Sequence, residues 1–417
     1  MSARSETFAT PALAPRGIAR LIFCNLAAQS AEQIAVAAAA IIAVADLGAP
    51  PAQAGWLQTA QTLPFLLLAI PAGLAADRAS RTRLMVGAEA LRAVCLLGVA
   101  TLAARGSLTV PLLGLLGFLA ATGTLAYSVA APSLVPALAR REHLARANTR
   151  LELARSAAFA AGPAMAGFLV AGGAGLAFGA AALLSITGMV LLAGLREPPR
   201  ATPARRPAMA ELGAGIVFIA RHKLLRPVAL TAIVFNLSFF VMQAIYVPHA
   251  VRDLGLSSAG IGVSMASYGA GMVAGALLAP VLARCLRFGR QVAIGPLAGF
   301  AASLAMLATL AWPTPLLAAL SFFLIGAGPI VWTITTTTLR QAVTPPALLG
   351  RVSAALLTAT WGVRPLGAAA AALIASGPGI GACLFVATTG FAIQAAIVLA
   401  SPVARLSALP DAVSDWT

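Results

Sequence analysis

Residues 73–83 read GLAADRASRTR, a short basic turn with a single acidic residue, Asp77, between two long apolar stretches. Each neighbouring stretch has about 20 apolar residues, the length that a helix needs to cross a bilayer core of about 30 Å. Such stretches recur from Gly17 to Ser401, about twelve in all, with short polar breaks between them. With 60% hydrophobic and only 10% charged residues, the chain is predicted to be an all-α polytopic membrane protein.

The apolar stretches fall into two groups of six. The predicted spans are 17–45, 54–76, 84–104, 108–136, 147–172 and 174–195, then 224–250, 258–283, 291–311, 315–340, 348–375 and 379–401. We therefore expect an N-terminal bundle over 1–195, a linker over 196–223, a C-terminal bundle over 224–401 and a tail over 402–417. The linker starts with REPPRATPARRP and continues into a segment expected to lie on the membrane surface as an amphipathic helix.

The basic residues show how the chain is threaded. When the helices alternate across the membrane, 23 of the 28 Lys and Arg residues fall on one side, three lie within the helices, and only Arg105 and Arg252 fall on the other side. The positive-inside rule then puts both termini on the cytoplasmic side of the membrane, which we expect to be a bacterial inner membrane. The net charge of +16 is thereby explained by topology, and we expect no nucleic-acid partner.

We find no set of residues in the sequence that matches a known catalytic motif. The three histidines are far apart, the four cysteines are scattered singly, and HExxH, GxSxG and phosphate-loop patterns are missing from the sequence. We expect no catalytic residues, no metal and no cofactor. A membrane-embedded enzyme is the alternative from another functional class.

The turn at 73–83 resembles the signature between helices 2 and 3 of the major facilitator superfamily, with Gly73, Asp77, Arg78, Arg81 and Arg83 at matching positions. A short repeat supports two related halves, since Leu144-Ala-Arg-Ala-Asn is similar to Leu349-Gly-Arg-Val-Ser. The resemblance implies twelve transmembrane helices in two pseudo-symmetric six-helix bundles. It also implies that the acidic residue and its basic neighbours close a cytoplasmic gate.

Two further stretches resemble the drug and siderophore exporter branch. They are AEALRAV in the third helix, with Glu89 and Arg92 on one face, and TPPALLGRVSA before the eleventh. GPAMAG in the fifth helix is similar to the antiporter motif through Gly162, Pro163 and Gly167, but Ala166 replaces its second paired glycine. The second-half copy of the loop signature, around 275–290, has no Asp.

Charged residues within the predicted helices are the main candidates for function. Glu32 lies near the middle of the first helix, and an unpaired carboxylate at that depth costs several kcal/mol, so we favour a proton-coupling or cation-binding role. The alternative is a structural carboxylate that hydrogen-bonds to neighbouring helices. Glu89 with Arg92, and also Arg155 and Arg364, are assigned to the cytoplasmic gate, and a scaffold role is the favoured interpretation for each.

The first and fourth helices of each half line the cavity in the resembled fold. This sorts the polar and aromatic side chains into cavity candidates, although each of them also fits a helix-packing role. The candidates are Asn25, Gln29, Gln33, Tyr127, Ser128, Asn236, Gln243, Tyr246, Trp332, Thr333 and Thr336.

The resemblance implies a secondary active transporter that exports a small amphipathic drug, siderophore or metabolite, with proton antiport as the favoured coupling. Uptake, facilitated permeation and lysolipid transport by the same fold are the alternatives. The expected partners are a small-molecule substrate, protons and the lipid bilayer, and the chain is expected to act as a monomer.

Overall fold

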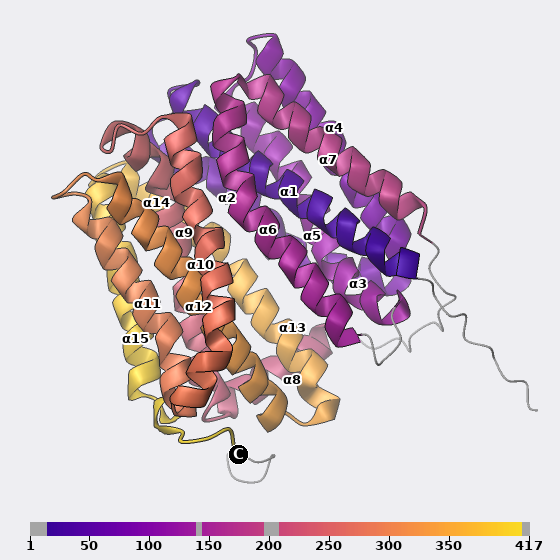
Figure 1. Cartoon of the computed structure of the whole chain (residues 1–417), viewed down its shortest axis with the longest axis vertical. Coiled ribbons are helices and arrows are strands. Elements are labelled where there is room, and N and C mark those ends of the chain that lie inside the picture. The colour runs from indigo at the N-terminus through magenta and orange to yellow at the C-terminus, as the bar shows by residue number, and fades with distance from the viewer. Residues whose placement is uncertain (1–14, 139–143, 196–207, 411–417) are drawn as a thin grey trace, which may run out of the picture.

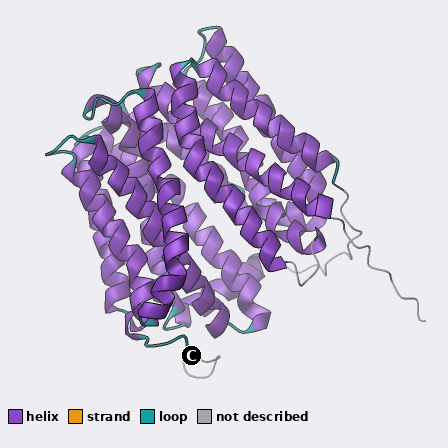
Figure 2. Ribbon diagram, viewed as in Figure 1, coloured by secondary structure: helices purple, strands orange, loops and turns teal. Residues whose placement is uncertain are grey.

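The computed structural model describes residues 15–138, 144–195 and 208–410. Over these ranges the regular structure is helical and contains no strand (Figure 2). The N-terminal half consists of α1 (Pro15–Ala45), α2 (Pro51–Leu67), α3 (Ala69–Arg78), α4 (Arg81–Ala104), α5 (Val110–Leu138), α6 (Leu144–Ala171) and α7 (Ala174–Ala193). The predicted all-helical membrane fold is confirmed.

The second half follows α8 (Ala208–Arg221), which lies in the segment expected as the linker. It consists of α9 (Leu225–Arg252), α10 (Ser258–Cys285), α11 (Phe288–Ala308), α12 (Pro315–Val343), α13 (Pro346–Gly362), α14 (Arg364–Ala375) and α15 (Ile380–Ala400), followed by a 3₁₀ turn at Pro402–Arg405. The two halves lie side by side in Figure 1, purple to magenta against salmon to yellow.

Eleven segments of the described chain are long and apolar enough to cross a membrane, with α13 and α14 taken as one. The remaining span, predicted as one helix over 54–76, is α2 followed by α3. The breaks at Leu68 and Val363 correct two spans that we expected to be continuous, and proline explains both. Pro71 and Pro365 lack the N–H of an interior helical residue, but each fits within the first turn of a new helix.

The bundle has two ends. We call the end at which α7 stops and α9 starts the linker end, and the opposite end, where α1 meets α2 and α9 meets α10, the far end. In the half of the bundle nearer the far end, the two halves touch backbone to backbone. A Cβ built on Gly262 of α10 would lie 2.4 Å from the Pro163 carbonyl oxygen of α6. One on Gly269 would lie 2.2 Å from the Ala160 Cα.

A second contact between the halves joins α2 to α14. A Cβ on Gly55 would lie 2.7 Å from the Cα of Ala372. Beyond it, Arg252 of the second half donates a hydrogen bond to the Ala49 carbonyl oxygen of the first at 3.4 Å. Small residues allow such close approach without a polar anchor at every step. Glycine packing therefore closes the far end.

Candidate functional site

A cavity of about 550 Å³ lies between the two halves. Its walls come mainly from α1, α2, α4, α5 and α6 on one side and from α9, α10, α12, α13 and α14 on the other, with single residues or short stretches of α7, α11 and α15. This volume is typical of pockets that hold a drug-sized ligand. Among the described residues, four charged ones line it: Glu32, Arg92, Arg155 and Arg364.

Glu32 lies on the α1 wall of the cavity, half-buried, beside Gln33. Among the described residues it forms no ion pair. The charges of Arg92, Glu89, Arg364 and Arg155 all act on it, and two of the three arginines come from its own half of the chain. The position combines a carboxylate, access to the cavity and a net positive surrounding.

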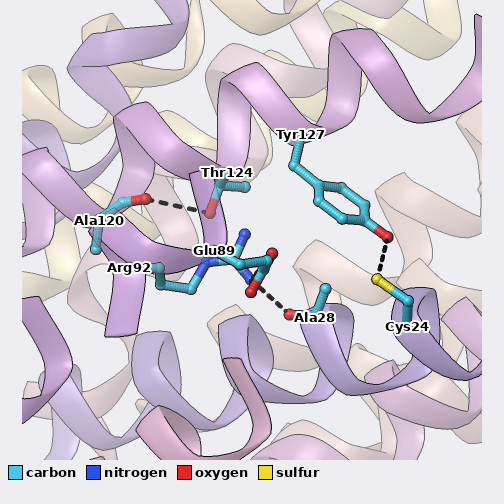
Figure 3. A network of polar contacts seen from close by, with 7 residues as sticks. All are labelled: Cys24, Ala28, Glu89, Arg92, Ala120, Thr124 and Tyr127. Carbon is cyan, nitrogen blue, oxygen red and sulfur yellow. Dashed lines mark hydrogen bonds and ion pairs between the residues drawn. The ribbon is translucent and has the colours of Figure 1, made fainter. Parts of the chain in front are cut away.

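Arg92 and Glu89 of α4 form a buried ion pair with 3.1 Å between Nη1 and Oε1. Nη1 also donates to the Ala28 carbonyl oxygen of α1 at 2.8 Å, so the arginine ties α4 to α1 (Figure 3). Nearby, Tyr127 of α5 contacts the Cys24 thiol with 3.5 Å between Oη and Sγ. The network crosses three helices of the first half.

Arg155 of α6 is also paired, with 3.0 Å from its Nε to Glu152 Oε2. Its guanidinium carbon lies 5.4 Å from the centre of the Phe159 ring. Arg364 differs from both. Its Nε donates to the Asn236 amide oxygen at 3.3 Å, and it faces aromatic rings in place of a carboxylate.

Aromatic side chains form much of the remaining wall, and sequence reasoning did not assign them. Phe65 of α2 and Trp361 of α13 meet edge to face across the boundary between the halves, with ring centres 5.2 Å apart. Each comes from the last two turns before a proline-linked break, which ends its helix beside the cavity. The others are Phe159, Phe178, Phe235, Phe239, Phe240, Tyr268 and Phe322.

The polar candidates separate into two sets. Gln33, Asn236, Gln243, Trp332 and Thr333 line the cavity, whereas Asn25, Gln29, Tyr127, Ser128, Tyr246 and Thr336 lie outside its lining. Several of the second set are bonded within the helix packing. Asn25 donates to the Leu151 carbonyl oxygen at 3.2 Å, Tyr246 bonds to the Ser264 hydroxyl, and Thr336 donates to the Trp332 carbonyl oxygen at 2.8 Å.

Sequence reasoning also missed polar residues of α2. Gln58, Gln61 and Thr62 line the cavity and are almost fully buried. Their spacing of i, i+3 and i+4 on an apolar helix was the available signal, since it puts three polar groups on one face. The assumption that only the first and fourth helices of each half line the cavity left them out.

The residues of the two sequence motifs occupy different regions. Gly162 and Gly167 pack tightly. A Cβ on Gly162 would lie 2.4 Å from the Gln33 Cβ, and one on Gly167 would lie 2.4 Å from the Ser258 carbonyl oxygen of the other half. Pro163 of the same motif lines the cavity.

The signature turn joins α3 to α4 at the linker end. Gly73 has open space around its Cα, and the Ser80 hydroxyl accepts a hydrogen bond from the Arg83 amide at 3.3 Å, which caps α4. Arg81 is half-buried at the first position of α4. The side chains of Asp77 and Arg78 lie outside the described residues, so the gate assigned to this turn stays a prediction.

Two helical halves around a polar and aromatic cavity define a multi-pass membrane transporter. Residues 21–368 match the family described as the Major Facilitator Superfamily. The chain is also 30% identical over 287 residues to the enterobactin exporter EntS of Escherichia coli O1:K1 / APEC, which covers 67% of each protein. The Citrobacter koseri enterobactin exporter EntS matches with the same identity and coverage. The chain therefore belongs to the Major Facilitator Superfamily and is a transporter rather than an enzyme.

Solved structures agree with this fold. The nucleoside transporter NupG superposes with a TM-score of 0.72 at 13% identity, covering 92% of this chain and 99% of that one. A bacterial homologue of the iron transporter ferroportin in an inward-facing state also gives a TM-score of 0.72, at 16% identity over 92% of this chain and 98% of that one. At these identities the likeness concerns the fold alone.

Proposed function

We propose that the protein exports a small amphipathic molecule across the bacterial inner membrane in exchange for protons. The observation that carries the proposal is Glu32, a carboxylate on the wall of a cavity shared by both halves that forms no ion pair with any described residue. The relationship to the enterobactin exporters supports export over uptake. The aromatic wall supports an amphipathic substrate, since aromatic side chains bury large apolar areas.

The conformation fits one stage of alternating access. The basic residues at the linker end argue for a cytoplasmic location of that end, so the glycine contacts at the far end close the cavity toward the outside. Substrate would enter from the cytoplasm or the inner leaflet. The halves then rock about the cavity until the contacts at the far end separate and those at the linker end form.

Coupling would run through the charge of Glu32. An ionised carboxylate inside a membrane is costly unless cations or water compensate it, and here the cavity arginines supply part of that compensation. A proton arriving from the outside would neutralise Glu32 and weaken its attraction to those arginines. Release of the proton toward the cytoplasm would restore the attraction and complete the cycle.

The test is efflux from proteoliposomes that contain the purified full-length protein. A panel of cationic dyes, antibiotics and siderophores is loaded, a pH gradient is imposed, and Glu32→Gln is compared with the parent. Glu211→Gln is the matched control, because it removes a carboxylate from α8, outside the cavity.

We expect gradient-driven efflux by the parent and by Glu211→Gln, and loss of the gradient dependence in Glu32→Gln. Efflux by Glu32→Gln that keeps the full gradient dependence would refute the coupling role. Gradient-independent movement by the parent would indicate facilitated permeation, and accumulation in the opposite direction would indicate uptake.

A further inference from the structure

Arg364 stands on the cavity wall at the point where the eleventh span breaks. It is the first residue of α14, directly after the break at Val363. Its guanidinium carbon lies 5.2 Å from the centre of the Trp361 ring, 5.4 Å from that of Phe240 and 5.8 Å from that of Phe65. These rings come from three different helices of both halves, so the cation sits in an aromatic cage between them.

Glu32 attracts the charge of Arg364 across the cavity, but Arg364 has no bonded carboxylate of the kind that the other cavity arginines have among the described residues. Arg92 and Arg155 each hold a carboxylate of their own helix, whereas no described carboxylate forms an ion pair with Arg364. The neutral amide of Asn236 and the three rings are its contacts. The rings and the amide carry no negative charge, so the positive charge of the guanidinium favours an anionic partner in the cavity.

We propose that Arg364 binds the anionic group of the substrate, and that this substrate is an aromatic carboxylate or phenolate whose ring packs against Trp361 and Phe65. The inference rests on the proposed function only in that the cavity holds the substrate. It adds the chemical class of that substrate.

The free donors of Arg364 suit such a group. The guanidinium offers five N–H donors, and its hydrogen bond to Asn236 uses only that on Nε. The terminal nitrogens are thus available for the two parallel bonds that a carboxylate accepts. An anion held there would lie beside Trp361, where an attached ring would find aromatic partners at the distances of ordinary ring packing.

Three residues of the wall also carry a buried polar atom without a hydrogen-bond partner among the described residues. Trp332 Nε1, Gln243 Oε1 and Thr231 Oγ1 belong to residues that line the cavity, and each lacks a hydrogen-bond partner within the described structure. Buried polar groups in folded proteins are rarely left in this condition. These atoms lie beneath the surface of the cavity in this conformation, so the wall would have to rearrange before a ligand could bond to them.

The experiment measures equilibrium binding to the purified full-length protein by isothermal titration calorimetry. Three probes separate the two requirements: 2-naphthoate has a ring and a negative charge, 2-naphthylmethylammonium has a ring and a positive charge, and decanoate has a negative charge without a ring. We compare the parent with Arg364→Gln and Arg364→Lys. Arg105→Gln is the matched control, since it removes one exposed positive charge far from the cavity.

We expect 2-naphthoate to bind best to the parent. Arg364→Gln should weaken that binding by about 10- to 100-fold, the range for a lost charge-assisted hydrogen bond. Arg364→Lys should fall between them, because it keeps the charge but not the paired donors. Equal binding of the ammonium probe, or unchanged binding of 2-naphthoate to a folded Arg364→Gln, would overturn the proposal.

The comparison of the three probes on the parent needs no variant, so it tests the preference for an aromatic anion even if Arg364→Gln does not fold. Failure of 2-naphthoate to bind more tightly than about 1 mM would also overturn the proposal. The two proposals fail separately. Gradient-driven efflux of cationic dyes without binding of 2-naphthoate would support proton-coupled export and overturn the anion site. Binding of 2-naphthoate without any gradient-driven efflux would support the anion site and overturn proton-coupled export.

Discussion

Substitution of Gly262 by alanine should open the far end of the transporter. The new Cβ would lie 2.4 Å from the Pro163 carbonyl oxygen and 3.0 Å from the Gly167 Cα, and both are backbone atoms that no rotamer change can move away. Ordinary contact begins at 3.4 Å, so α6 and α10 must separate by roughly 1 Å. This contact joins the two halves, and in the proposed alternating-access cycle it exists only while the far end is closed.

The magnitude follows from the overlap. Overpacking of a close contact costs about 1–3 kcal/mol. The cost acts on the closed conformation alone, whereas the gain in helix propensity from glycine to alanine is common to both conformations. The equilibrium should therefore shift by about 5- to 150-fold. A preference of about 9:1 for the closed far end would fall to about 2:1 at the low estimate and reverse at the high one.

Pulsed electron paramagnetic resonance between spin labels at positions 105 and 310 would measure the shift. These exposed positions lie at the far end, one in each half. We expect a longer-distance population in Gly262→Ala. Gly87→Ala is the control, because the new Cβ in the second turn of α4 would meet nothing within 4 Å, and the distances in this variant should match those in the parent. Identical distance distributions for Gly262→Ala and the parent would refute the reasoning.

Two other predictions concern stability. Arg92→Met leaves the carboxylate of Glu89 buried and unpaired, and should lower the free energy of unfolding by about 3–5 kcal/mol. The double variant Glu89→Gln with Arg92→Met should recover most of this loss. Equal melting temperatures of Arg92→Met and the parent would contradict the prediction. The Nδ1 of His222 accepts hydrogen bonds from the amides of Leu224 and Leu225, and burial lowers its pKa. Stability should therefore fall by at most about 1.4 kcal/mol per pH unit as the pH drops below about 6.5, until the native pKa is passed. If the melting temperature of His222→Gln depended on pH in the same way as that of the parent, the prediction would be wrong.

The fold was predictable because its signals are local. A stretch of about 20 apolar residues identifies a membrane span without reference to any other part of the chain. The breaks at Leu68 and Val363 were less visible, since prolines are common in membrane helices and only some of them interrupt the helix. Pro64, Pro163 and Pro296 lie inside helices that continue through them.

The site was predictable only in part. Glu32 stood out because a carboxylate in an apolar helix is costly wherever its helix lies. Arg155 and Arg364 were placed at a gate on the same reasoning, and the structure puts both on the cavity wall. Their surroundings decide what each does, and a sequence does not display them. Aromatic residues carry no such cost, so those of the cavity look like ordinary lipid-facing or packing residues.

The sequence by itself determined the membrane class, the two groups of spans and the side on which the positive charge collects, because hydrophobic length and charge are properties of single segments. Only the tertiary structure decided that Phe65 and Trp361 meet and that Arg364 faces rings in place of a carboxylate. It also decided which end is closed. These features arise where helices remote in sequence pack against each other, and the packing depends on the shapes of both partners.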